Sequence, residues 1–243
     1  LFSRMHKAMC VIMFKLEGQI IARRPEYQMP DRDMLSRINY QNGTIEIDGT
    51  VYPLRDTDFP TIDPADPNKL TPEEQDIIDG LVSSFRRSEK LQIHTRFLYS
   101  VGSIYRRHNG NLLYHGCIPM TENREFDGLM VGGKMYRGKE LMDFIDTQVK
   151  NAYFLPEDAP EKEACRDFMW YLWNGAKSPV FGKDKNRSFE HYFIEDPEVM
   201  RETMNPYYQL SEKEDCCRKI LKEFGLSPEE GHIINGHVPV KLK

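Results

Sequence analysis

The spacing of apolar residues changes near residue 108, and this change limits the folds that the chain can adopt. Before it, apolar side chains recur every three or four residues, in 4–24 and again after Thr71, which is the period of amphipathic helices. After it, short apolar runs alternate with helical stretches. The sequence therefore predicts a mostly helical region over 1–107 and an α/β (α+β) region over 108–243.

Local signals predict the individual helices. Two of them begin with capping boxes, which pair Thr71 with Glu74 and Ser211 with Glu214. The predicted helices cover residues 4–24, 71–85, 88–100, 138–151, 160–173 and 211–224.

Turn residues predict two hairpins. Asp48-Gly49 lies between short β-branched runs and predicts a hairpin at 44–54, inside the helical region. A second hairpin is predicted around Gly132-Gly133.

Composition excludes several classes of protein. With 40% hydrophobic and 29% charged residues, the chain is neither fibrous nor wholly disordered. A net charge of −5 argues against nucleic acid as a partner, and no apolar run approaches the ~20 residues that span a bilayer. The five cysteines are odd in number and irregularly spaced, which predicts reduced thiols and a cytoplasmic protein. The chain opens on Leu1 without a targeting pattern, and we expect it to be a piece of a longer protein.

Two segments share one design, a histidine with a neighbouring glycine at the end of an apolar strand. His115 follows the run 111–114, and His237 follows Ile233-Ile234. Strand ends are where α/β proteins present metal ligands and catalytic groups, and glycine lets the backbone turn sharply there. A histidine held only by structural hydrogen bonds is the alternative for each of them.

Several longer segments are distinctive as a set. They are KLEGQIIARRPE (15–26), FPTIDPADP (59–67), NLLYHGCIPM (111–120), MWYLWNGAKSPVFGKDK (169–185), NPYY (205–208) and IINGHVPVK (233–241). These segments resemble class III, Firmicute-type fructose-1,6-bisphosphatase, a family of calcineurin-like metallophosphatases, and they occur in the order of that family. Matching stretches cover essentially the whole chain.

The resemblance implies a metal centre of two divalent ions, typically Mn²⁺. Within the superfamily, a strand-end His-Gly and a later Gly-His each supply one ligand to the second ion, which by resemblance are His115 and His237. Two such ions would clamp a phosphate and lower the pKa of a bridging water. The fold implied is the C-terminal part of a calcineurin-like β-sandwich flanked by helices, preceded by a helical insert.

The chain also departs from the superfamily. The motifs Gly-Asp-x-His, Gly-Asp-x-x-Asp-Arg and Gly-Asn-His, which supply the remaining ligands and the general-acid histidine, do not occur in it. By resemblance they belong upstream of Leu1. We therefore assign no catalytic residue within the chain and expect the chain alone to be inactive.

Other candidate residues have weaker support. Lys183, Lys185 and Arg187 follow Gly182 in a cationic loop that could hold the distal phosphate of a sugar bisphosphate, with a solvated surface loop as the alternative. Cys117 could be a soft ligand, although a buried structural thiol is the simpler interpretation. The remaining histidines lie in no motif and are expected to be structural or exposed; they are His6, His94, His108, His191 and His232.

The resemblance implies part of a cytoplasmic, manganese-dependent enzyme of gluconeogenesis that hydrolyses fructose 1,6-bisphosphate to fructose 6-phosphate and phosphate. One alternative is a related metallophosphoesterase that acts on phosphoproteins or dinucleoside polyphosphates. Another is a non-catalytic interaction module, whose helices would form the interface of a homo-oligomer. The expected partner is a small sugar bisphosphate, with no nucleic acid and no membrane.

Overall fold

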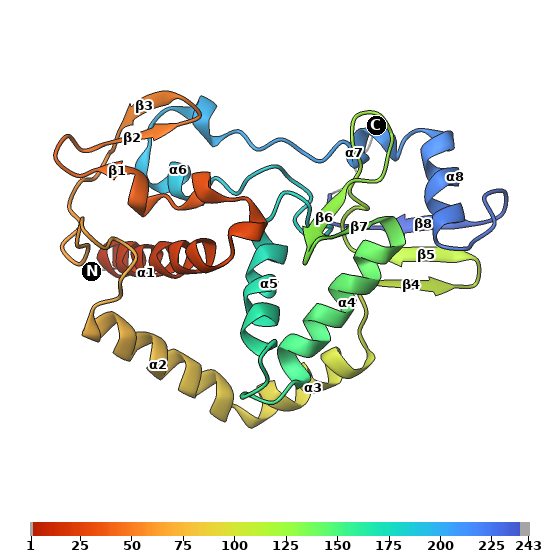
Figure 1. The fold of residues 1–243 in the computed structure, drawn as a ribbon, viewed down its shortest axis with the longest axis horizontal. Helices are drawn as coiled ribbons and strands as arrows, with labels where there is room; N and C mark the ends of the chain where they lie inside the picture. The colour runs from red at the N-terminus through yellow and green to blue at the C-terminus, as the bar shows by residue number, and fades with distance from the viewer. Residues whose placement is uncertain (1, 239–243) are drawn as a thin grey trace. The chain divides into compact units, whose positions relative to one another are not determined.

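The computed structural model describes residues 2–238 (Figure 1). Internal contacts divide the chain into two compact units, here called the first unit (residues 1–94 and 187–201) and the second unit (residues 95–186 and 202–243). This division differs from the predicted boundary at residue 107, chiefly because the chain returns to the first unit after residue 186.

The first unit is built on the helix α1, which spans Phe2–Arg23 and confirms the helix predicted at 4–24. Phe14 on this helix packs edge-on against Phe189 of α6 (Ser188–Phe193), with ring centroids 5.3 Å apart. The core of the unit consists of Cys10, Phe14, Met34, Leu35, Ile38, Ile45, Ile47, Leu54, Phe189, Phe193, Ile194 and Val199. The late segment that carries α6 (Ser188–Phe193) and η4 (Pro197–Met200) supplies the last four of these.

A small antiparallel sheet covers the same core. Its strands, in spatial order, are β1 (Ile38–Asn39), β2 (Thr44–Ile47) and β3 (Thr50–Pro53). Asp48 and Gly49 form the turn between β2 and β3 with positive φ angles of 49° and 83°. The predicted hairpin at 44–54 is therefore confirmed.

The helix α2 (Pro72–Arg87) begins with the predicted capping box. The backbone N–H of Glu74 donates to Oγ1 of Thr71 at 3.2 Å, and the N–H of Thr71 donates to Oε2 of Glu74 at 2.8 Å. Both bonds satisfy amide groups that would otherwise lack a partner at a helix start. The helix α3 (Glu89–Val101) follows directly.

The second unit contains a three-stranded sheet in the order β4 (Tyr105–His108), β5 (Asn111–Tyr114) and β8 (His232–Asn235). β4 and β5 pair antiparallel, whereas β5 and β8 pair parallel in a register that sets Leu112 opposite Ile233 and Tyr114 opposite Asn235. Because the two strands are parallel, the residues that follow them emerge at the same edge. The core around this sheet consists of Leu112, Tyr114, Cys117, Ile118, Met120, Met142, Tyr207, Cys216, Ile220, Leu221 and Phe224.

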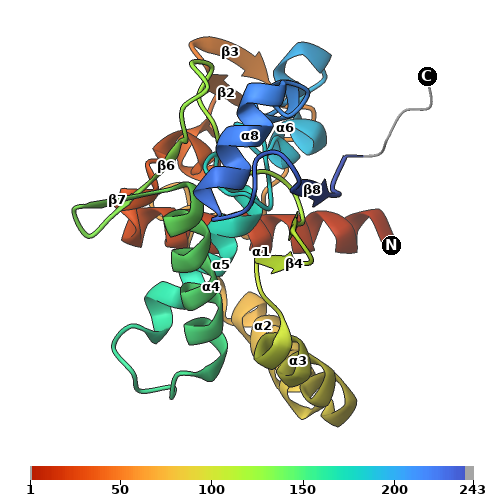
Figure 2. The same ribbon diagram turned by 90° about the vertical axis from the view of Figure 1, so that its right-hand side faces the viewer.

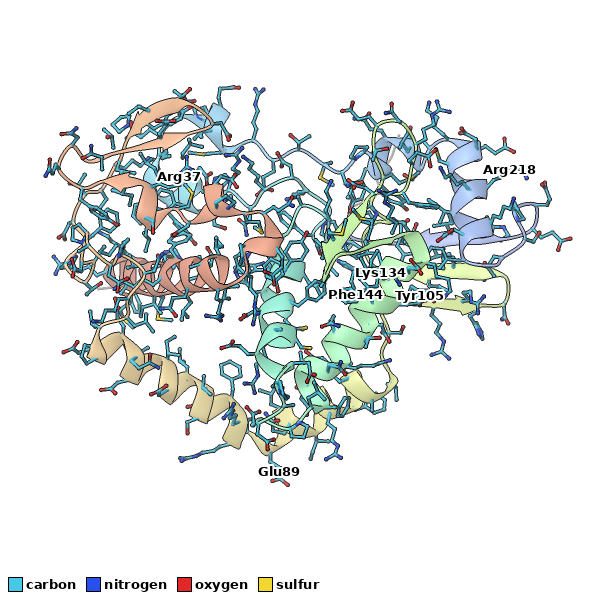
Figure 3. All side chains as sticks on the ribbon, viewed as in Figure 1. Arg37, Glu89, Tyr105, Lys134, Phe144 and Arg218 are labelled. Carbon is cyan, nitrogen blue, oxygen red and sulfur yellow. The ribbon has the colours of Figure 1, made fainter. Side chains whose placement is uncertain are left out.

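A second hairpin packs against the helices of this unit. Strands β6 (Gly128–Val131) and β7 (Lys134–Arg137) form it around Gly132-Gly133, as predicted. The Tyr136 ring of β7 stacks on Phe144 of α4 (Gly138–Phe154), with ring centroids 4.3 Å apart. Phe144 is labelled in Figure 3. The helix α5 (Lys162–Asn174) packs along α4.

The last helix, α8 (Glu214–Glu223), packs beside β8 (Figure 2). The predicted capping box at its start is wrong. Lys213 is its N-cap residue and makes no side-chain cap, whereas Ser211 ends the short helix α7 (Tyr207–Leu210) and bonds to the Tyr208 carbonyl. Because Ser211 belongs to the turn that ends α7, it does not act as the N-cap of α8.

Helices and small sheets together confirm the mixed α+β class. None of the helices in the described part of the chain is both long and apolar enough to cross a membrane.

Candidate functional site

His115 and His237 lie side by side at the end of the β5–β8 pair. The Nε2 atom of His115 is 3.0 Å from the Nδ1 atom of His237, and the two rings are almost perpendicular. The N–H of Gly236 donates to the His115 carbonyl at 2.9 Å, and the Asn235 side chain donates to the Gly116 carbonyl at 2.9 Å. The two strand ends are thus joined to each other, and the two rings meet at their common edge.

Backbone geometry explains why glycine stands beside His115. A Cβ atom on Gly116 would lie 2.3 Å from the Pro179 carbonyl oxygen, to which the N–H of Cys117 donates at 2.9 Å. His237 itself has a φ of +66°, a region that side-chain-bearing residues seldom occupy. Residues held in such conformations concentrate at functional sites, because the surrounding structure must compensate for their strain.

The surroundings favour the neutral form of His237. Burial lowers the pKa of His237, and the nearby His115 and Lys183 lower it further, while a backbone hydrogen bond to Phe181 acts in the opposite direction. The Tyr208 ring lies over His237 with centroids 6.4 Å apart and planes 29° apart. Neutral imidazole is the form that binds metal ions.

The geometry of the pair fits two ligands of one ion. Two nitrogens bound ~2.1 Å from the same metal at angles of about 90–110° lie about 3.0–3.4 Å apart. The observed 3.0 Å is within that range, and it is also the length of a hydrogen bond between one protonated and one bare nitrogen.

Two imidazoles do not complete a metal site. Within residues 2–238, no group of three or more His, Cys, Asp or Glu side chains is placed to hold an ion. A dinuclear centre that uses His115 and His237 would therefore need carboxylates that this part of the chain does not bring to them.

Cys117 has the environment of a structural thiol. Its side chain is 1% exposed within the core of the second unit. Burial raises the pKa of Cys117 to about 12, so the thiol stays protonated and is a poor metal ligand. The other five histidines are exposed and lie outside any such group, as expected.

The three cations of the 183–187 loop have different surroundings. Lys183 pairs with Glu202 at 2.5 Å and stays partly exposed in the second unit, where Lys185 is also half-buried. Arg187 belongs to the first unit, where it is buried and paired with Glu190 and Asp48. Arg187 is thus engaged by carboxylates of its own unit, and a role of the three cations in binding a distal phosphate stays a prediction.

A cavity of about 590 Å³ opens in the second unit, and Lys183 lines it. Lys177, Asn205 and Asp127 also line it, and sequence reasoning assigned no role to these residues. Each lies in an irregular segment without a spacing pattern, and the only signal was that Lys177 and Asn205 fall within segments that carry the family resemblance.

Comparisons with known proteins agree with that resemblance. All of residues 1–243 match the family model described as Firmicute fructose-1,6-bisphosphatase. The chain is 51% identical over 243 residues to "Fructose-1,6-bisphosphatase class 3 1" of Clostridium beijerinckii, which it covers to 36%. It is 51% and 49% identical to proteins named "Fructose-1,6-bisphosphatase class 3" of Clostridioides difficile and Porphyromonas gingivalis, each covered to 37%.

The chain is covered completely in each of these matches, yet it spans only about a third of the length of the relatives. No solved structure matches it.

Proposed function

The chain belongs to the Firmicute fructose-1,6-bisphosphatase family, and from this premise we propose that the full-length protein hydrolyses fructose 1,6-bisphosphate to fructose 6-phosphate and phosphate. The relatives carry this activity in their names. The proposal includes a cytoplasmic enzyme of gluconeogenesis, and a calcineurin-like sandwich to which β5 and β8 contribute neighbouring strands.

The observation that carries the proposal is the 3.0 Å separation between the facing nitrogens of His115 and His237. We assign both to one Mn²⁺ ion of a dinuclear centre. When bound, the ions would polarise the phosphate and provide a water of lowered pKa.

The residues of this chain orient the ligands. The Gly236 N–H and the Asn235 amide fix the two strand ends to each other, so that the two ring nitrogens lie 3.0 Å apart. Tyr208 covers one face of the His237 ring, and the Phe181 backbone bonds to the same ring. Hydrogen bonds of this kind set the tautomer and the orientation of a ligating histidine.

Phosphate release from fructose 1,6-bisphosphate, measured with Mn²⁺ and the full-length protein, tests the proposal. His115→Ala and His237→Ala should each lower kcat by at least about 100-fold, because either change removes a metal ligand. His108→Ala, which changes an exposed histidine of the same sheet, is the matched control and should keep the wild-type rate. The 243-residue chain alone should release no phosphate above background.

Two outcomes would contradict the proposal. Wild-type turnover by His115→Ala would show that the histidine pair does not hold a metal ion needed for catalysis. Hydrolysis of a phosphoprotein or a dinucleoside polyphosphate, with none of fructose 1,6-bisphosphate, would favour a related phosphoesterase instead.

A further inference from the structure

The cavity of the second unit has the size of a binding site for a small ligand. Its volume of about 590 Å³ is within the usual range for such sites, roughly 300–1,000 Å³. Three stretches of chain form its wall, at residues 120–122, 176–184 and 203–210, and Asp127 adds to them.

Two of the stretches that line the cavity also contain a residue that contacts His237. In the first, Phe181 bonds to the ring of His237 through its backbone, and Lys183, two residues on, lines the cavity. In the second, Tyr208 lies over His237 while Asn205 and its neighbours line the cavity. The N–H of Asn205 donates to the Gly182 carbonyl at 2.9 Å and ties the two stretches together.

Gly182 makes this close arrangement feasible. Its φ is +65°, and a Cβ atom there would lie 2.5 Å from the hydroxyl oxygen of Tyr208. A larger residue would push apart the segment that lines the cavity and the ring that covers His237.

Asn205 presents an amide donor of fixed orientation to the cavity. Its side chain is 8% exposed, and its Oδ1 accepts hydrogen bonds from the N–H groups of Met120 (3.1 Å) and Tyr207 (3.0 Å). These two bonds fix the orientation of the amide. Its Nδ2 group, which carries two N–H donors, is left to donate to a molecule in the cavity.

Two ammonium groups line the same cavity. Lys183 pairs with Glu202 and Lys177 pairs with Asp127, and both side chains stay partly exposed. One carboxylate does not use the three donors of a lysine, so each ammonium can also bind an anionic oxygen.

The rest of the lining indicates what class of ligand fits. Glu122 and Asp184 add carboxylate oxygens, which accept hydrogen bonds from hydroxyl groups. No aromatic side chain is among the described residues that line the cavity, so a nucleobase would find no stacking surface. Cations, an amide and carboxylates together suit a molecule that carries both phosphate and hydroxyl groups.

We propose that this cavity binds the sugar and the non-reacting phosphate of a sugar bisphosphate, with Lys183 and Lys177 on the phosphate and the Asn205 amide as a further donor. The assignment rests on the proposed function, because the reacting phosphate is then the one at His115 and His237. Of the cationic loop that the sequence predicts as a phosphate site, this cavity includes Lys183 but not Arg187.

The test compares two kinds of ligand on the full-length protein. Lys183→Gln and Lys177→Gln should each raise KM for fructose 1,6-bisphosphate about tenfold or more, because a charged hydrogen bond to phosphate is lost. Activity on p-nitrophenyl phosphate, which has one phosphate and no sugar, should not change. Lys183→Arg should restore most of the affinity.

The matched control is Lys150→Gln. Lys150 pairs with Asp146 at 2.6 Å with exposure similar to that of the Lys183 pair, but it lies outside the cavity lining. It should leave both activities unchanged. Equal losses on both substrates in the cavity variants, or no loss on either, would overturn the proposal.

Calorimetry with fructose 6-phosphate separates this proposal from the proposed function. This product keeps the non-reacting phosphate and needs no hydrolysis in order to bind. Weaker binding by Lys183→Gln and Lys177→Gln, with normal binding by Lys150→Gln, would support the cavity even if no bisphosphate were hydrolysed. Equal binding by all variants would overturn it.

Discussion

The two units use charged and titratable side chains in different ways. In the first unit Lys15 is fully buried and pairs with Glu74 at 2.7 Å, and Glu190 is fully buried and accepts from Arg32 at 2.6 and 2.9 Å. In the second unit His115 and His237 are exposed and face each other. Buried charged groups whose hydrogen-bonding partners are all present stabilise the fold. Exposed groups that face each other and lack further partners can instead bind a ligand.

The largest expected effect is on the buried charges of the first unit. Glu190→Gln keeps the volume of the side chain but leaves Arg32 and Arg187 without its negative charge. Breaking a buried ion pair costs about 3–5 kcal/mol, and we expect the unfolding free energy to fall by that amount. Glu195→Gln, which changes an exposed carboxylate of the same unit, should cost less than about 0.5 kcal/mol.

Two spectroscopic signals show which unit loses stability in Glu190→Gln. Trp170 and Trp173 both lie on α5 in the second unit, so their fluorescence reports on that unit, whereas circular dichroism reports on both. In a urea titration, Glu190→Gln should shift the dichroism transition more than the fluorescence transition. An unchanged dichroism transition would show that Glu190 does not stabilise the fold.

A smaller effect depends on pH. Burial alone would raise the pKa of Glu74, but hydrogen bonds from Lys15, Thr71 and Thr61 outweigh it and hold the pKa below its ordinary value of 4.5. The carboxylate therefore stabilises the first unit above about pH 4.5, and this contribution is lost as the pH falls through the lowered pKa.

Unfolding free energies of the wild type and Glu74→Gln, measured between about pH 6 and pH 3, test this expectation. The difference between them should be largest near pH 6 and shrink as Glu74 becomes protonated. A difference that stays constant over this range would contradict the assignment.

The smallest effect on stability is expected at the histidine pair. His115→Ala should change the unfolding free energy by less than about 0.5 kcal/mol, because the side chain is exposed and lies outside the core. Urea denaturation of the metal-free protein measures it. A loss of several kcal/mol would show that His115 stabilises the fold, as the buried charges of the first unit do. The two units would then not differ in the way described.

Features that depend on neighbouring residues could be predicted from the sequence. The capping box of Thr71 with Glu74 and the Asp48-Gly49 hairpin are set by local backbone preferences, and both formed. The meeting of His115 and His237 could also be predicted, because each has the same strand-glycine-histidine context and the two strands pair in parallel.

Features that depend on distant contacts could not be predicted in this way. Phe189 and Phe193 join the core of the first unit by packing against Phe14, more than 170 residues earlier in the chain, and no periodicity in 187–201 indicates that partner. The cavity is likewise made from separate loops. Lys177 and Asn205 have functional surroundings only once those loops have folded together.

The central claim is that His115 and His237 hold one ion of a manganese centre, and equilibrium dialysis with Mn²⁺ tests it most directly. The full-length wild type and His108→Ala should bind two ions per chain, and His115→Ala and His237→Ala should each lose tight binding of one of them. Undiminished binding of both ions by His115→Ala and His237→Ala would contradict the account.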